Sequence, residues 1–130
     1  MDRINKEKTQ IDIFGDIYNL DDIELFYVDG KKLIFLKKDG VKTYNCYDAS
    51  KCFKEIATEI IINRLEHFVL LLTADNMVNI NNIKNISKND NNLIIETKNH
   101  NYTLENAIFV DFMCLRDRLK IKTSDKNLSK

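Results

Sequence analysis

The chain has 130 residues, of which 44% are apolar and 31% charged, as expected for one globular domain. Its 20 basic and 20 acidic residues give a formal net charge of zero, which argues against a strongly basic nucleic-acid-binding surface spread over the whole chain. No apolar run reaches the roughly 18 residues of a membrane span and no apolar leader opens the chain, so we expect a cytoplasmic protein without a membrane partner.

The two halves of the chain repeat one pattern of apolar residues. An offset of 60 residues places segment 17–23 on segment 77–83 and segment 33–35 on segment 93–95. A repeat at a fixed offset is typical of a duplicated supersecondary unit. We therefore expect a single domain, 1–130, built of two repeats at about 10–66 and 67–120 and followed by a basic polar tail at 121–130.

The first repeat is predicted to contain four strands and a helix. Runs of β-branched and aromatic residues predict the strands, which are Gln10–Phe14, Ile17–Val28, Lys32–Lys38 and Lys42–Tyr47. Asp29-Gly30 and Asp39-Gly40 indicate hairpin turns, because these residues tolerate positive φ. An apolar stripe at helical spacing then predicts a helix over Ala49–Arg64, with Asp48 as its N-cap; the stripe is Ala49, Phe53, Ile56 and Ile60.

The second repeat is predicted to follow the same order. Its strands are expected at Phe68–Thr73, Met77–Ser87, Asn92–Lys98 and Tyr102–Glu105, and its helix at Ala107–Lys120. Ile108, Phe112, Leu115 and Leu119 reproduce the helical stripe at an offset of 59 residues. The predicted fold is α+β: an internally duplicated ββββα unit with antiparallel sheets and one amphipathic helix per repeat.

No residue pattern indicates catalysis, a cofactor or a metal. Cys46, Cys52 and Cys114 form no C-x-x-C pair, which predicts free and mostly buried thiols, and neither His67 nor His100 has a ligand partner at helical spacing. No glycine-rich phosphate loop occurs. At the 60-residue offset, the carboxylates of segment 21–24 correspond to neutral or basic residues of segment 81–84. We therefore expect segment 21–24 to be a solvated turn. An enzyme is not expected.

Charge is distributed unevenly along the chain. Residues 11–115 carry five more acidic than basic groups, whereas residues 116–130 carry six basic and two acidic groups. The cations at the start of this last segment are Arg116, Arg118, Lys120 and Lys122. They suit either the C-terminal dipole of a helix or the phosphates of a nucleic acid. If DNA is bound, we expect this tail to supply most of the attraction.

The order of these signals resembles that of the LytTR-type DNA-binding domain. Segment 22–28 fits the family's D-I-x-y-i-e-like strand, Asp39-Gly40 fits its hairpin, and segment 68–83 fits the V-N…I end of its F-x-x-x-H-x-S-x-x-V-N-x-x-x-I-like strand. The resemblance covers about Ile11–Leu119 and implies a related topology and DNA contacts from polar and basic loop residues. The family's His-x-Ser position reads Thr73-Ala74-Asp75, and Asn106 replaces an Arg.

Two hypotheses follow. The first is a non-catalytic binding protein, a small protein-interaction or inhibitory module of bacterial, phage or plasmid origin that binds a protein partner or itself. The alternative is a LytTR-like transcription regulator without a receiver domain. Its expected DNA contacts are Lys31, Lys32, Asn76, Asn106, Arg116, Arg118, Lys120 and Lys122.

Overall fold

The computed structural model describes the backbone of residues 2–128 and the side chains of residues 2–120. Within these residues the chain forms ten strands and two helices, so the predicted α+β class with antiparallel sheets is confirmed. The first half contains β1 (Gln10–Ile13), β2 (Asp16–Asn19), β3 (Ile23–Asp29), β4 (Lys32–Lys37), β5 (Gly40–Asn45) and α1 (Ala49–Ile62).

The second half has the same order of elements. It contains β6 (Phe68–Leu71), β7 (Asn76–Asn79), β8 (Ile83–Asn89), β9 (Asn92–Thr97), β10 (Asn101–Leu104) and α2 (Phe109–Leu128). Each half therefore consists of a hairpin, a three-stranded meander and a helix.

The strands form three antiparallel sheets. β1 and β2 form a two-stranded sheet, β10-β9-β8 a three-stranded sheet, and β5-β4-β3-β7-β6 a five-stranded sheet. The five-stranded sheet joins the two halves, because β7 of the second half pairs with β3 of the first, with Phe26 opposite Met77.

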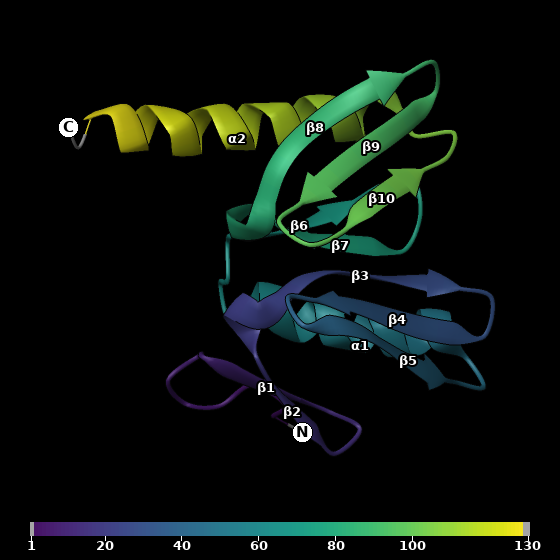
Figure 1. Ribbon diagram of the computed structural model, residues 1–130. Coiled ribbons are helices and arrows are strands. Elements are labelled where there is room, and N and C mark those ends of the chain that lie inside the picture. The colour runs from purple at the N-terminus through teal and green to yellow at the C-terminus, as the bar shows by residue number, and fades with distance from the viewer. Residues whose placement is uncertain (1, 129–130) are drawn as a thin grey trace.

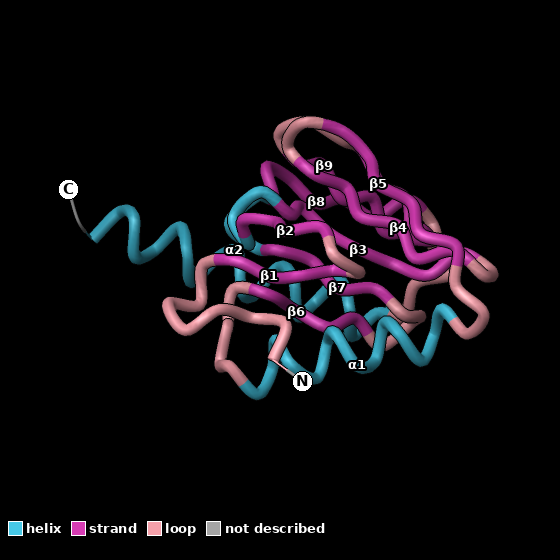
Figure 2. Tube along the Cα trace, turned by 90° about the horizontal axis from the view of Figure 1, so that it is seen from below, coloured by secondary structure: helices cyan, strands magenta, loops and turns pink. Residues whose placement is uncertain are grey.

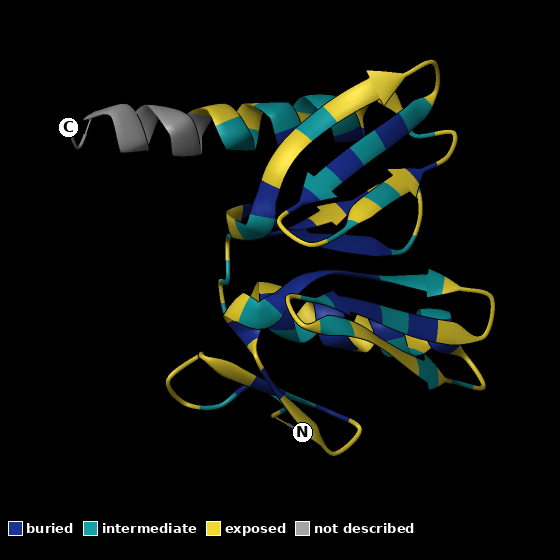
Figure 3. Cartoon of the chain, in the orientation of Figure 1, coloured by how far each residue is buried: buried dark blue, intermediate teal, exposed yellow. Residues whose placement is uncertain are grey.

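The sheets and helices stack in layers around two hydrophobic cores (Figure 1). One core lies where α1 and the β1–β2 hairpin pack on the five-stranded sheet, around Phe26, Phe35 and Phe53. The other lies between the five-stranded and three-stranded sheets and includes Leu115 of α2. Buried residues therefore concentrate on the central strands (Figure 3), and Figure 2 shows α1 running alongside β6.

Each half has five strands where the sequence predicted four, because one predicted strand in each half is interrupted. A 3-10 turn at Leu20–Asp22 divides Ile17–Val28, and another at Ile80–Asn82 divides the corresponding second-half strand. Leu20 is 2% exposed and Ile80 4% exposed, so burying one apolar side chain accompanies each change of strand direction. Because of this turn, each hairpin belongs to a different sheet from the meander that follows it.

The two helices fulfil their predictions unequally. Asp48 caps α1 as predicted, accepting a hydrogen bond from the Lys51 N–H at 3.1 Å, and Phe53 is 1% exposed. In α2 only Leu115 of the predicted stripe is fully buried; Phe112 and Leu119 are partly buried, and Ile108 is 43% exposed. The helix also continues to Leu128, so most of the predicted tail is helical, with side chains outside the described residues.

Two structural details recur at equivalent positions in the two halves. Gly30 and Asp90, 60 residues apart, both have positive φ at the tips of their hairpins. The Tyr44 hydroxyl donates to Asp16 at 2.6 Å, and the Tyr102 hydroxyl donates to Asn76 at 2.5 Å. These matches favour a duplication, which stays a prediction.

No helix among the described residues is both long enough and apolar enough to cross a membrane.

Candidate nucleic-acid interface

The predicted contacts Lys31 and Lys32 lie at the turn between β3 and β4. Both are exposed. The Lys31 Nζ lies 5.9 Å from the centre of the Tyr47 ring. Acidic residues occupy the same turn and the neighbouring loop, at Asp29 and Asp48. The two lysines are therefore accessible, but their surroundings are of mixed charge.

The two predicted asparagine contacts are placed differently. Asn76 is 2% exposed and accepts the Tyr102 hydroxyl, so its side chain is a packing element of the core and cannot reach a duplex. That prediction is wrong because the three-stranded sheet packs on this face of the five-stranded sheet, with Tyr102 of β10 against Asn76. Asn106 is exposed in the loop before α2, at φ 52°, and its N–H donates to Asn92 Oδ1.

The basic residues of α2 divide by position. The Arg118 guanidinium donates to the Glu66 carbonyl, which ties α2 to the segment before β6. Arg116 Nε is buried and lies 3.9 Å from Asp117. Lys120 is exposed, whereas the side chain of Lys122 lies outside the described residues. Within residues 2–120, Lys120 is therefore the predicted α2 contact whose charge is available.

A more concentrated basic site lies at the opposite end of the molecule from Lys31. A cavity of about 560 Å³ is lined by Lys38, Asn81, Asn82, Ile83, Lys84 and Lys98; we call it the lysine pocket. Its lysines come from the β4–β5 turn, the start of β8 and the β9–β10 turn, which meet at the left in Figure 1. All three are exposed, and none forms an ion pair with a described residue.

Hydrogen bonds hold this pocket between the two halves. The Lys38 N–H donates to the Asp22 carbonyl at 2.9 Å, and the Asn82 amide donates to the Asp21 and Ile23 carbonyls at 2.9 and 3.0 Å. The turns carrying the lysines are thus fixed to one another through backbone groups. Three unpaired ammonium groups around polar amides create a local positive potential. The exposed carboxylates of Asp21 and Asp39 lie at the same end and offset part of it, although Asp39 pairs with Lys37 at 3.5 Å.

A buried carboxylate lies behind the pocket. Glu24 is 0% exposed, so the predicted solvated turn at 21–24 is wrong at this residue. Its carboxylate accepts from Thr97 Oγ1 at 2.6 Å and from the Asn99 amide at 3.3 Å, and it lies 3.7 Å from His100 Nε2. Because these bonds cross from β3 to the β9–β10 turn, they fix the turn that carries Lys98.

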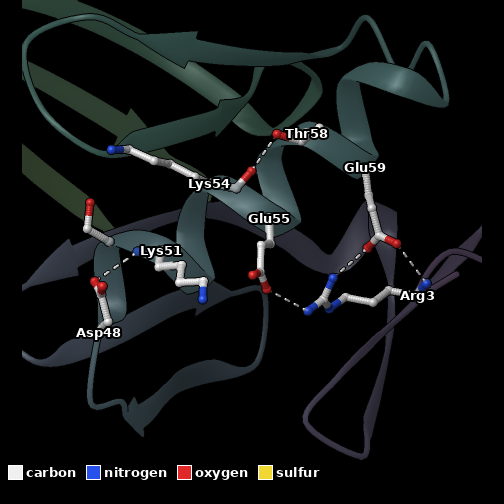
Figure 4. Close-up of a pocket in the computed structure, with 8 residues that line it drawn as sticks. Arg3, Asp48, Lys51, Lys54, Glu55, Thr58 and Glu59 are labelled. Carbon is white, nitrogen blue, oxygen red and sulfur yellow. Dashed lines mark hydrogen bonds and ion pairs between the residues drawn. The ribbon is translucent and has the colours of Figure 1, made fainter. Parts of the chain in front are cut away.

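Another cavity, of about 840 Å³, follows the outer face of α1, and Arg3 pairs there with two of the lining carboxylates. Arg3 Nη1 lies 3.0 Å from Glu59, and Arg3 Nη2 lies 3.4 Å from Glu55 (Figure 4). These ion pairs fasten the N-terminal segment to α1. The cavity is therefore a solvated helix surface and a poor candidate for ligand binding.

The cysteines show no site chemistry. Cys46 and Cys52 are half-buried, and burial with the neighbouring Cys52 thiol raises the pKa of Cys46, which disfavours a reactive thiolate. Cys114 is exposed, contrary to the expectation of mostly buried thiols. No group of three His, Cys, Asp or Glu within the described part of the chain is arranged to hold a metal ion.

The sequence analysis missed the lysine pocket, although a signal existed. Lys38 and Lys98 are 60 residues apart, and each is the last residue of the third predicted strand of its repeat. Lys84, in contrast, occupies the position of Glu24 in the first half. The pairing of β3 with β7 brings these distant segments to one end, which spacing alone does not reveal.

Comparison with known proteins shows the fold. No family model and no curated protein matches the sequence. A solved structure described as the LytTr DNA-binding domain of a methyl-accepting/DNA response regulator from Bacillus cereus is similar at a TM-score of 0.53 and 11% identity. The match covers 82% of this chain and 93% of that one. The chain therefore has a LytTR-type fold.

Proposed function

We propose that this protein binds double-stranded DNA through phosphate contacts made by the lysine pocket. The observation that carries the proposal is the convergence of Lys38, Lys84 and Lys98 around one cavity on a LytTR-type fold. Unpaired lysines release condensed counterions when they meet phosphates, and this release drives most non-specific DNA binding. The open polar cavity suits a duplex backbone, and no catalytic step is proposed.

The shape of the molecule supports this placement. α2 runs toward the end where the lysine pocket lies (Figure 1), and Lys120, the last basic residue of α2 whose side chain is described, is exposed. The acidic residues around Lys31 disfavour the other end, because like charges repel phosphates. By this proposal the protein is a LytTR-like transcription regulator.

The test is the salt dependence of DNA binding. We expect binding to a mixed-sequence duplex at low salt, measured by fluorescence anisotropy, that weakens as salt rises. Replacing all three pocket lysines by Gln removes three phosphate contacts and should lower the slope of log K against log salt by about 2.7. A wild-type chain that does not bind at low salt contradicts the proposal.

A matched control separates the pocket from the opposite end. The triple substitution Lys31→Gln, Lys32→Gln and Lys88→Gln removes the same charge from exposed lysines near the β3–β4 and β8–β9 turns. We expect it to change the slope much less than the pocket variant. An equal or larger loss would move the interface to the Lys31 turn and refute the pocket assignment.

A second function, protein binding, is favoured by exposed apolar residues on one sheet edge. Leu70 and Leu72 are 40% and 66% exposed, and Ile61 on the adjacent helix is 55% exposed. Clusters of this kind are common at protein interfaces.

A further inference from the structure

The edge strand β6 differs in chemistry from the other strands that end a sheet. Its sequence, Phe68–Leu71, contains no polar residue. By contrast, β5 carries Lys42, β8 carries Lys84 and Lys88, and the described strands β1, β2 and β10 each contain polar residues. Charged residues on edge strands normally prevent pairing with another chain. β6 therefore lacks the usual protection.

The backbone of β6 is open at one residue. The Ile80 N–H donates to the His67 carbonyl, and Val69 lies opposite Val78 in the same ladder. Hydrogen-bonded residues alternate along an antiparallel ladder. The backbone groups of Val69 and Leu71 therefore bond to β7, whereas the N–H and C=O groups of Phe68 and Leu70 point away from β7. The Phe68 N–H already donates to the Leu65 carbonyl, so Leu70 is the β6 residue whose N–H and carbonyl both face the edge without a partner among the described residues.

An apolar groove lies beside this edge. A cavity of about 430 Å³ separates α1 from β6 and the following turn, with Phe53, Ala57, Ile61, Leu70 and Leu72 among its lining residues. Leu70 is on the same face of the strand as Phe68, which packs toward α1. The open backbone and the exposed side chains therefore belong to one surface, the β6 edge.

We propose that two copies of this chain associate through their β6 edges, with β6 pairing antiparallel to β6 of the second copy. A two-fold axis at Leu70 lets each Leu70 N–H donate to the Leu70 carbonyl of the other copy. The same register places Leu72 opposite Phe68 of the second copy on the α1 face. Such an isologous interface closes on itself and joins the two five-stranded sheets.

Charge at the two ends of the strand supports a second copy as the partner. Glu66 precedes β6 and is exposed, whereas Lys54 of α1 is exposed and lines the groove together with Leu72–Asp75, at the other end of the strand. Antiparallel pairing brings the start of one β6 beside the end of the other. Each Glu66 then approaches Lys54 of the second copy, and this happens twice in a two-fold dimer.

The first experiment measures the oligomeric state of the full chain without DNA, by sedimentation velocity at about 10–500 µM protein, a range that includes weak interfaces. We expect a concentration-dependent dimer. Leu70→Lys should raise the dimer dissociation constant by at least about tenfold. Val41→Lys is the matched control, because Val41 is an exposed apolar residue (57%) on the edge strand β5, and it should leave the constant unchanged.

A charge exchange tests the register. Glu66→Lys and Lys54→Glu should each weaken the dimer, and the double variant should restore it, since both pairs are then re-formed with opposite polarity. Circular dichroism confirms folding of each variant. A monomeric wild type, a dimer that tolerates Leu70→Lys but not Val41→Lys, or a double variant weaker than both single variants overturns the proposal.

Discussion

Buried polar residues are the least predictable feature of this chain at the scale of single residues. Glu24, Asn76, Asn79, Thr97 and Asp111 are all buried, yet each residue type is usually exposed. Asp111 shows the reason: its carboxylate accepts the Leu72 and Thr73 N–H groups at 2.7 and 2.8 Å, across 38 or more residues. Such partners are set by tertiary structure, so no local pattern indicates them.

The bond between Thr97 and Glu24 allows a direct test of this burial. Thr97→Val keeps the shape of the side chain but removes the donor 2.6 Å from the buried carboxylate. We expect the free energy of unfolding to fall by about 1–3 kcal/mol, because the buried carboxylate loses a donor and the His100 N–H, which donates to the same hydroxyl at 2.9 Å, loses its acceptor. Urea denaturation measures the change. Thr103→Val, at an exposed site on β10, should have little effect, and equal losses would contradict the role of the bond.

His67 gives the chain a predicted pH dependence. Its Nε2 is buried with no hydrogen-bond partner among the described residues, and burial lowers its pKa below the ordinary 6.5, an effect that Asp21 opposes only in part. The unfolded chain therefore binds a proton more readily than the folded one, and the free energy of unfolding should fall as pH drops below about 6.5.

The measurement is urea denaturation of the wild type and His67→Gln between about pH 8 and pH 5, where the histidine titrates. As the pH falls, the unfolding free energy of the wild type should decrease relative to that of His67→Gln. Curves that stay parallel over this range would show that His67 binds its proton equally in both states.

At the scale of elements, helices and hairpin turns were predicted better than strand boundaries. Asp48 and the stripe around Phe53 fix α1, because capping and helical spacing are local. The 3-10 turns at Leu20 and Ile80 were missed although Asn or Asp residues flank both positions, because no Gly or Pro marks a turn there and the bend accompanies burial in the cores. The pairing of β3 with β7 is equally non-local.

The unequal burial of the two helices predicts unequal mutational costs. Phe53→Ala should lower the free energy of unfolding by about 3–5 kcal/mol, because it leaves a cavity in a closed core. Phe112→Ala should cost less, since Phe112 is only partly buried against the second core. Thermal and urea denaturation of both variants decide the order. A larger loss at Phe112 would mean that α2 contributes more to the core than its exposure indicates.

The duplication predicts how the two halves should superpose. Residues about 10–65 and 68–120 should align strand for strand, with the Tyr44–Asp16 and Tyr102–Asn76 bonds in equivalent places. An experimental structure provides the measurement. Two halves whose strands align in a different order would show that the 60-residue offset reflects composition and not a shared ancestor.

At the scale of the whole molecule, zero net charge hides a division that decides how DNA is approached. Residues 11–115 are net negative, yet the lysine pocket lies on this same body. Net charge along the sequence predicted that the C-terminal segment supplies most of the attraction to DNA. The fold adds a second basic centre by bringing Lys38, Lys84 and Lys98 together at one end.

Deleting residues 123–130 compares these two sources of attraction. From the sequence alone, the deletion should remove most DNA affinity; with the lysine pocket present, we expect affinity to fall and a measurable salt-dependent fraction to remain. The deleted segment carries two Lys and one Asp, so the slope of log K against log salt should fall by at most about 1.8. Combining the deletion with the three pocket substitutions should then abolish binding.

Anisotropy titrations at several salt concentrations measure each step, and circular dichroism checks that the shortened chain folds. A deletion that abolishes binding by itself would assign DNA attraction to the C-terminal segment and leave the pocket without this role.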